Sequence, residues 1–356
     1  MSNRKYIALD VHKATCQASV RNDVGRVIAR STFETNRRGI INFLASQPGE
    51  SWVAFEEGTH ANWLYDIIQP RVHQVIVCNP RKSKQHGNKS DRIDADRLSE
   101  LLRNGSLSPV YHGERSTRTI QELGRSYERL TEDAVRIKNR VKAIYRGRGI
   151  ECEGAGVFDP AQRSEWLKKL NQSGARRRAE RLLRELEAIE PLQEEAEREL
   201  IAEGRKYRAT KILRTIPGIG PLRAAMLVAI VMTPFRFRTK RQFWAYAGLS
   251  LVTRSSADHS FVEGELHRSR KAPLVLGLNF DFNHTLKGIF KSAAVSAATR
   301  GGFQPYFQER VQQGQAANLV MLTIARKIAS VTLALWKKGE QYDPVKHGLE
   351  HNDSTE

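Results

Sequence analysis

The middle of the chain carries a long apolar repeat, which constrains the fold more than any other feature of the sequence. From Ile120 to Ile144, apolar side chains recur at alternating intervals of three and four residues. This period lasts for more than three repeats and predicts a long helix that packs against another helix. The alternative is an amphipathic helix on the surface of a domain. In both cases a helical segment separates two regions of different character.

A second helical stretch can supply a partner for this helix. Its apolar positions are Ala175, Ala179, Leu182, Leu186, Ile189, Leu192, Ala196 and Leu200. Pro191 interrupts the series, and we expect it to kink or end the helix. Glycines at 147, 149, 154 and 156 break the chain between the two stretches. Residues 113–208 are therefore predicted to form a coiled-coil helical arm, which either folds back at the glycines or pairs with a second subunit.

The region before the arm predicts an α/β layer. Short apolar runs typical of strands begin at Tyr6, Thr15, Val27, Ser51 and Gln74, and helical patterns cover 36–45, 61–68 and 89–98. This order of three strands, helix, strand, helix, strand and helix suits a mixed sheet. We expect residues 1–112 to form one domain of this kind.

Acidic residues stand at the ends of predicted strands and on the last helix of this domain. Asp10 ends the first strand, and Glu56 and Glu57 follow the fourth. Asp91 and Asp94 are three residues apart, so they share one face of a helix. Each acid alone is more often structural or solvated. Together, however, they predict a cluster of hard oxygens that suits Mg²⁺, an ion able to assist phosphoryl transfer.

The region after the arm predicts a helical domain with two motifs suited to nucleic acid. Residues 216–221 read Ile-Pro-Gly-Ile-Gly-Pro, which resembles the hairpin of a helix-hairpin-helix unit. Backbone N–H groups at the start of the second helix of such a unit can meet a phosphate. A plain corner between two core helices is the alternative. Aromatic and basic residues then alternate from Phe235 to Arg238, and Lys240 and Arg241 follow.

Composition narrows the class of partner. The chain of 356 residues has 58 Lys and Arg against 39 Asp and Glu, a net charge of +19. Such an excess favours a polyanion, and nucleic acid first. Three cysteines without CxxC spacing fit a reducing compartment. With neither a signal-peptide pattern nor an apolar run long enough to span a bilayer, we expect a cytoplasmic, nucleoid-associated protein of a bacterium and no membrane.

Four segments of the first domain carry a family resemblance. They read Ala-Leu-Asp-Val-His-Lys from residue 8, Phe-Glu-Glu-Gly-Thr from 55, Asn-Pro from 79 and Lys-Ser-Asp-Arg-Ile-Asp-Ala from 89. They resemble the RuvC-like domain of the IS110 family, transposases that recombine DNA under the guidance of a bridge RNA. The resemblance implies an RNase H fold and Mg²⁺ held by four acids. These are Asp10, Glu56, Asp91 and Asp94, with Glu57 as the alternative to Glu56.

The resemblance continues to about residue 342. After the Pro-Gly-Ile-Gly segment and the Tyr-Ala-Gly-Leu segment at 246–249, family members carry a nucleophilic serine. Counting from Gly248, Ser256 falls at that position, and Ser255 is the alternative. Ala257 stands where family members usually have glycine. The implied reaction is cleavage of a DNA strand through a covalent phosphoserine, followed by rejoining to another DNA.

The resemblance also implies domains and partners. Residues 209–346 would form the serine transposase domain, and 347–356 a disordered tail. The partners would be donor and target DNA, a non-coding bridge RNA and further copies of the chain, as a dimer or tetramer joined through the arm. The residues assigned to nucleic-acid contact are Lys89, Arg92, Gly218, Gly220, Arg236, Arg238, Lys240 and Arg241.

Two other functions remain open on the sequence. A RuvC-like, metal-dependent endonuclease would use the same acids and let water attack the phosphate. A non-enzymatic scaffold would bind nucleic acid through the basic arm alone. Because the acids and the serines lie in domains separated by the arm, a site shared between two subunits is a further expectation.

Overall fold

The computed structural model describes residues 4–80, 91–112, 115–254, 259–262, 265–268 and 274–347. The side chains of Asp91, Arg92 and Arg115, and most of those from 259 to 268, also lie outside this description. The chain divides into two compact units, Met1–His112 and Gly113–Glu356, each of which is considered by itself.

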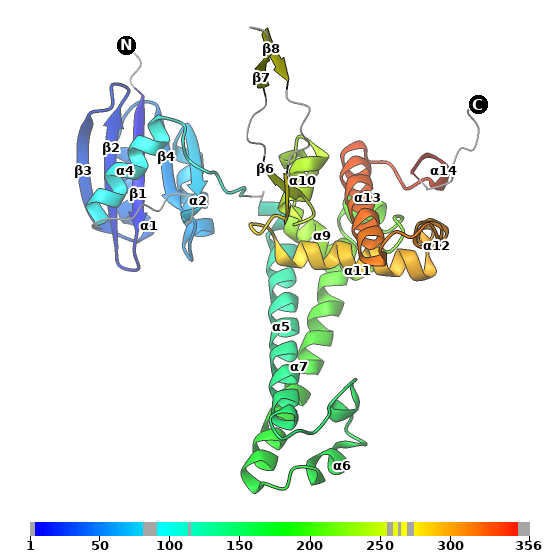
Figure 1. Cartoon of the computed structure of the whole chain (residues 1–356). Helices are drawn as coiled ribbons and strands as arrows, with labels where there is room; N and C mark the ends of the chain where they lie inside the picture. The colour runs from blue at the N-terminus through cyan, green and yellow to red at the C-terminus, as the bar shows by residue number, and fades with distance from the viewer. Residues whose placement is uncertain are drawn as a thin grey trace. The chain divides into compact units, whose positions relative to one another are not determined.

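The first unit is built on a mixed five-stranded sheet (Figure 1). Its strands are β1 (Lys5–Val11), β2 (Thr15–Asn22), β3 (Val27–Glu34), β4 (Ser51–Glu56) and β5 (Gln74–Cys78), in the order β3-β2-β1-β4-β5. β1, β2 and β3 are antiparallel neighbours, whereas β4 runs parallel to both β1 and β5. The predicted α/β layer with a mixed sheet is confirmed.

Helices cover both faces of this sheet. The helices α1 (Arg37–Ala45) and α2 (Ala61–Ile68), the latter followed by η1 (Gln69–Arg71), pack on one face. The helix α4 (Asp91–Arg103) packs on the other. Ile7 and Leu9 of β1 are buried under α1 and α2, and Ala8 is buried under α4. The sheet therefore has a distinct α4 face.

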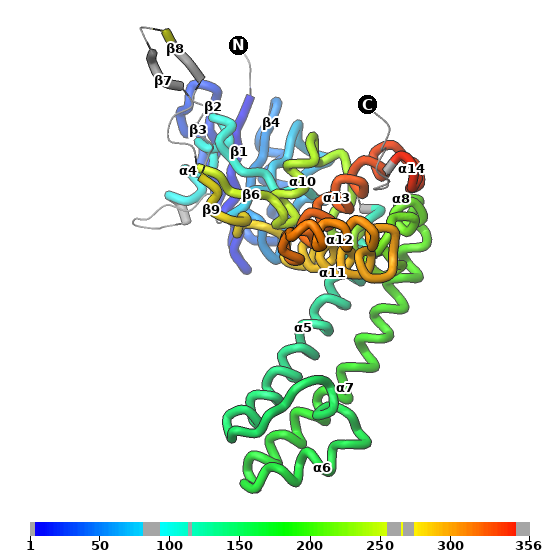
Figure 2. Tube along the Cα trace, turned by 45° about the vertical axis from the view of Figure 1, so that its right-hand side comes forward, coloured from blue at the N-terminus to red at the C-terminus, as the bar shows by residue number. Residues whose placement is uncertain are grey.

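The second unit begins with the predicted arm. After η2 (Arg115–Thr117), α5 (Arg118–Arg146) leads through η3 (Gly156–Phe158) and α6 (Arg163–Lys168) into α7 (Ser173–Gly204), which returns beside α5 (Figures 1 and 2). Ile137 and Val141 of α5 share a buried cluster with Ala179 and Leu183 of α7. The arm thus folds back on itself, so the apolar seam is used within one chain and gives no support to pairing between subunits.

Pro191 neither ends nor interrupts α7, which continues as one helix to Gly204. Proline removes a single N–H from the helical hydrogen bonds. Pro191 itself is exposed, so its ring is turned away from α5. Leu186 before it shares a buried cluster with Ile137 of α5, and Gln193 after it donates a hydrogen bond to Thr131 of α5, so both halves of α7 contact the same helix.

The rest of the second unit is a helical core. Its helices are α8 (Arg208–Leu213), α9 (Pro221–Val231), η4 (Pro234–Arg236), α10 (Lys240–Tyr246), α11 (His284–Arg300), α12 (Gln304–Gln312), α13 (Ala317–Lys338) and α14 (Pro344–His347). Ile120 of α5 and Leu200 of α7 belong to this core, so the base of the arm is part of it.

Two short ribbons interrupt the helices. β6 (Leu251–Arg254) pairs with β9 (Leu274–Leu278), and β7 (His259–Val262) pairs with β8 (Glu265–Arg268). None of these strands was predicted from the sequence. The four residues of β6 are all exposed, and its partner lies about twenty residues away, so neither burial nor a tight turn marks this strand locally.

α13 is long and apolar enough, by length and composition, to cross a membrane. In the structure, Ile324, Ile328 and Leu335 of this helix are buried in the core of the second unit. Arg326 donates a hydrogen bond to the carbonyl of Leu249, which ties the helix to the loop after α10. These contacts favour a core helix of a globular protein.

Candidate active site

Asp10 and Glu56 lie at neighbouring strand ends on the α4 face of the sheet. Side chains alternate between the two faces along a strand. Because Leu9 and Phe55 are buried on the opposite face, Asp10 and Glu56, the next residue in each strand, belong to the α4 face. The parallel register pairs Leu9 with Phe55, so the two acids follow side by side. Glu57 comes after the strand, with its N–H donating to the carbonyl of Cys78.

α4 runs antiparallel to β1, with its N-terminus toward these acids. Arg103, at its last residue, donates to the carbonyl of Asp23 in the turn between β2 and β3. That turn lies beyond the N-terminal end of β1, since Lys5 is opposite Asn22. Asp96, seven residues earlier, contacts Ser19, which is the register partner of Ala8. The first turn of α4 is therefore directed toward the Asp10 end of β1.

Asp91 and Asp94 stand in that first turn. Asp91 is the first residue of α4, and Asp94 is exposed. The sheet-facing positions of the helix are Ala95, Leu98 and Leu102, all buried. Asp91 precedes Ala95 by four residues in the helix, and its side chain lies outside the described residues. The predicted acids thus come from two neighbouring strand ends and one helix start at the same edge of the sheet.

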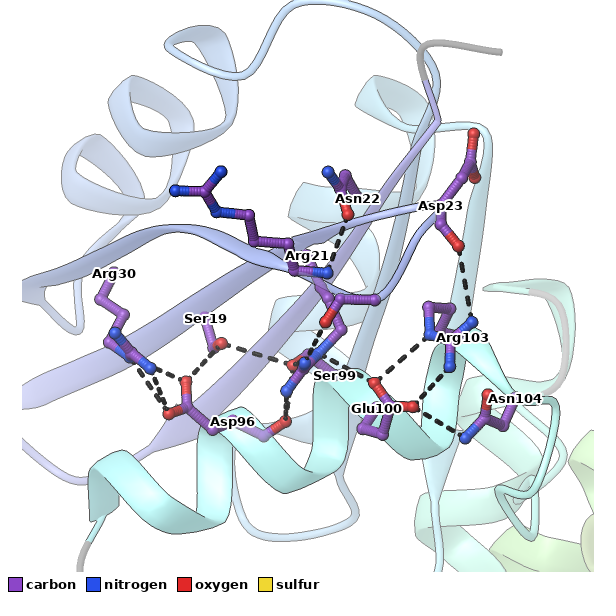
Figure 3. Close-up of polar contacts among 12 residues, drawn as sticks. Ser19, Arg21, Asn22, Asp23, Arg30, Asp96, Ser99, Glu100, Arg103 and Asn104 are labelled. Atoms are coloured by element: carbon purple, nitrogen blue, oxygen red, sulfur yellow. Dashed lines mark hydrogen bonds and ion pairs between the residues drawn. The ribbon is translucent and has the colours of Figure 1, made fainter. Parts of the chain in front are cut away.

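A network of hydrogen bonds fixes α4 on the sheet (Figure 3). Both carboxylate oxygens of Asp96 accept hydrogen bonds from Arg30 on β3, at 2.8 to 3.1 Å. Ser19 on β2 donates to the same carboxylate at 2.7 Å. Arg21 on β2 donates to the carbonyl of Asp96 at 2.9 Å and to the hydroxyl of Ser99 at 3.2 Å. These hydrogen bonds, called the clamp below, fix the rotation of α4 about its axis and its position along the sheet.

The clamp also sets the charge of Asp96. Burial acts to raise the pKa of its carboxyl group. Hydrogen bonds from Arg30 and Ser19, together with the charge of Arg30, outweigh burial and lower the pKa. Asp96 is therefore ionised near neutral pH and remains a charged partner for Arg30. A cavity of about 350 Å³ adjoins this ion pair and is lined in part by Gln17, the register partner of Asp10.

Asp10 has a titratable neighbour. The Nε2 atom of His12 lies 3.2 Å from Oδ2 of Asp10, and the ring is half exposed. A protonated ring would add a positive charge beside this carboxylate and compete with a cation for it. His12 was not predicted as a site residue, although it lies two residues after the acid.

The predicted serines fall outside the described residues. Ser255 and Ser256 lie between β6 and β7. Lys89, which precedes α4, also lies outside the described residues. Arg92 belongs to α4, but its side chain is likewise outside the description. The structure thus leaves the position of the serines relative to the acids as a prediction.

The predicted helix-hairpin-helix segment is the turn between α8 and α9. Gly218 has a φ of +81°, and a Cβ atom there would lie 2.2 Å from the carbonyl oxygen of Ala293 on α11. Glycine is needed at 218 for this close packing. Gly220 caps α9, and a Cβ there would meet nothing within 4 Å. Of the two glycines assigned to nucleic acid, Gly220 is the one beside open space.

The predicted basic residues gather around the start of α10. Arg238, Lys240 and Arg241 are exposed, and Thr239 forms a capping box that begins the helix between them. Arg236 instead stacks on Tyr246, with 4.7 Å from its Cζ atom to the ring centroid. Three of the four cations are therefore presented to solvent, as phosphate contacts require.

Two family models match the chain on either side of the arm. A DEDD transposase model, described as Transposase, matches residues 7–147, and the model Transposase IS116/IS110/IS902 family matches residues 210–274. This chain carries transposase domains of the IS110 family. No curated protein is similar enough to the chain to count as a match. The first match contains Asp10, Glu56, Asp91 and Asp94, and the second contains Ser255 and Ser256.

The transposase domains indicate DNA transposition or recombination as the activity, with DNA as the substrate. DEDD transposase domains usually use a divalent metal ion. Among the side chains that the structure describes, no three from His, Cys, Asp and Glu form a group that could hold a metal. Asp10 and Glu56, on one face of the sheet, provide carboxylate oxygens, which are the type of ligand that Mg²⁺ prefers.

Sequence reasoning missed the clamp that positions this edge of the transposase. Asp96 lies two residues after Asp94, and Arg30 lies 66 residues earlier on the outer strand. The one signal in the sequence is the strand pattern of β3, in which Arg30 alternates with Ala29, a residue packed on the opposite face. Only the antiparallel pairing of β2 and β3 brings Arg30 under α4.

Proposed function

We propose that this transposase cleaves and rejoins DNA strands through a serine nucleophile assisted by Mg²⁺. The ion would be held by Asp10, Glu56, Asp91 and Asp94 on a RuvC-like domain of RNase H fold. One observation carries this proposal. Asp10 and Glu56 are neighbours on the sheet face that α4 covers, and the N-terminus of α4, with the other two acids, is directed to the same edge.

The acids and the serine would have separate tasks. Ser256, with Ser255 as the alternative, would attack a backbone phosphorus, so that a Ser–O–P bond forms as the bond to the leaving sugar oxygen breaks. The serine loses a proton and the leaving oxygen gains one. When bound, Mg²⁺ supplies positive charge that stabilises the scissile phosphate. Reversal of the step with the end of another strand rejoins the DNA and frees the serine.

The further partners follow from the same proposal. A bridge RNA would select the DNA by base pairing, while Lys and Arg bind the backbones of both nucleic acids. A dimer or tetramer could share acids and serines between subunits. Because α5 and α7 pair within one chain, such an oligomer needs a surface other than the apolar seam of the arm.

A RuvC-like endonuclease is the alternative. It is favoured because the acids of the first unit could hold metal ions that activate water, and attack by water needs no serine. The two functions differ in a covalent intermediate, which a serine nucleophile forms and water does not.

The test is a trap for that intermediate. The full-length protein would be incubated with labelled DNA, the non-coding RNA that flanks its gene, and Mg²⁺, and then quenched in denaturant and separated on a gel. We expect a protein–DNA adduct for the wild type and for Ser255→Ala, and none for Ser256→Ala. Cut DNA without an adduct in all three samples would contradict the serine mechanism and support attack by water.

A further inference from the structure

The arm has two ends of opposite charge. Its base consists of residues 115–135 and 185–207, with seven Lys and Arg and twelve Asp and Glu, a net charge of −5. Its tip, residues 136–184, has fourteen Lys and Arg and five Asp and Glu, a net charge of +9. The tip comprises the far ends of α5 and α7 and the segment with α6 between them (Figure 1). At 1.5 Å per residue, α5 carries this charge roughly 40 Å from the core at Ile120.

Three cations of the tip gather around one buried residue. Burial raises the pKa of the Cys152 thiol, and the charges of Lys142, Arg146 and Lys169 act in the opposite direction. Lys142 and Arg146 are four residues apart on α5, so they share one face of that helix. Within the described residues, none of the three forms a salt bridge. Their charges are therefore available to an anion in solution.

Aromatic rings support these cations. The Nζ atom of Lys169 lies 3.8 Å from the ring centroid of Trp166, and that of Lys142 lies 5.5 Å from the ring centroid of Phe158. Trp166 in turn packs edge-to-face on the buried ring of Tyr145. Because ammonium groups lie over the rings of Trp166 and Phe158, these faces are occupied. The surface suits contact with phosphates better than stacking of unpaired bases.

A second set of cations lies on α7. Arg177, Arg181 and Arg184 are spaced four and three residues apart, so they form a stripe along one face of the helix. All three are exposed, and none forms a salt bridge with a residue that the structure describes. The base of the arm differs, since its Arg125 and Arg129 are each paired with a glutamate on the same helix.

We propose that the tip of the arm binds the phosphate backbone of double-stranded DNA. Paired bases are stacked inside a duplex, so a surface of cations without open aromatic faces matches its exterior. DNA is the substrate that the transposase domains imply. The acidic base of the arm repels the same backbone, which confines the contact to the tip. This surface acts independently of the acids and the serines.

The test compares two variants of equal charge loss in the full-length protein. The tip variant is Lys142→Gln, Arg146→Gln and Lys169→Gln, and the matched base variant is Arg125→Gln, Arg129→Gln and Arg198→Gln. Affinity for a fluorescent DNA duplex would be measured by anisotropy over a series of salt concentrations. Each lost phosphate contact lowers the slope of log K against log salt by about 0.9. We expect a loss of about two to three in slope for the tip variant and little change for the base variant.

A third variant is a control that separates loss of charge from a folding defect at the tip. Arg177→Gln, Arg181→Gln and Arg184→Gln leave the aromatic rings untouched, and we expect a similar loss of slope at an unchanged melting temperature. An equal effect of tip and base variants, or no effect of either tip variant, would overturn the proposal. So would a loss confined to an RNA duplex of the same length. The anisotropy assay measures binding alone, whereas the adduct trap measures the proposed chemistry, so failure of the chemistry and failure of the tip can be distinguished.

Discussion

At the scale of single residues, the pleat of β4 separates two adjacent glutamates. Phe55 is fully buried on the face that packs on α1 and α2. Glu56 therefore belongs to the α4 face with Asp10, whereas Glu57 follows the strand. A ligand of an ion shared with Asp10 has to be on the same face. The position of Glu56 on the α4 face therefore supports it as the ligand.

The two glutamates make a matched pair for mutagenesis. We expect Glu56→Gln to slow DNA cleavage by about 100-fold or more, because a ligand for the charge-stabilising ion is lost. Glu57→Gln should change the rate by no more than about twofold, as is usual for exposed positions. Rates of strand cleavage at saturating Mg²⁺ and the Mg²⁺ concentration for half activity would be measured. A stronger effect at Glu57 would show that the strand-end argument is wrong.

At the scale of elements, helices are held by contacts that differ in kind. α4 is fixed by the charged clamp of Asp96 and Arg30 beside a small apolar contact. The turn between α8 and α9 is fixed by steric fit, with Gly218 against the carbonyl of Ala293. The first contact depends on pH and salt, whereas the second does not.

The turn provides a test of steric fit. Gly218→Ala places a methyl group on the carbonyl of Ala293 and imposes a positive φ on alanine. We expect a loss of roughly 2–4 kcal/mol in the free energy of unfolding. Gly220→Ala, two residues on and beside open space, should change it by less than about 1 kcal/mol. Chemical denaturation followed by circular dichroism would measure both, and similar losses would contradict the packing described here.

At the scale of the whole molecule, the chain consists of two compact units with separate cores. The clamp of Asp96 belongs to the first unit alone. Because the folded state lowers the pKa of Asp96, its ion pair stabilises the fold above the ordinary pKa of 3.8. That contribution is lost as the pH falls further, through the lowered pKa of the folded state.

A fall in pH should therefore lower the free energy of unfolding of the first unit, and Asp96→Asn should remove this part of the pH dependence. Near pH 7 we expect Asp96→Asn to lower the stability of this unit by about 1 kcal/mol, since Arg30 is partly exposed. Below about pH 4 the difference from the wild type should shrink. Calorimetry of the full chain over this pH range would measure it. Asp133→Asn, on the arm, is the control and should leave the transition of the first unit unchanged. A difference that persists at low pH would exclude the proposed role of the charge.

The sequence by itself determined the strands and helices of the first unit, the two long helices of the arm and the order of the acids, but not the ribbons β6 to β9. Apolar periodicity is a local property, so the strands of the first unit and the helices α5 and α7 could be predicted from it. Only the tertiary structure decided which partner α5 takes, which face of the sheet α4 covers, and hence why Glu56 joins Asp10. The clamp from Arg30 to Asp96 depends on strand register and helix direction. Those features arise from contacts between distant residues, which no local pattern encodes.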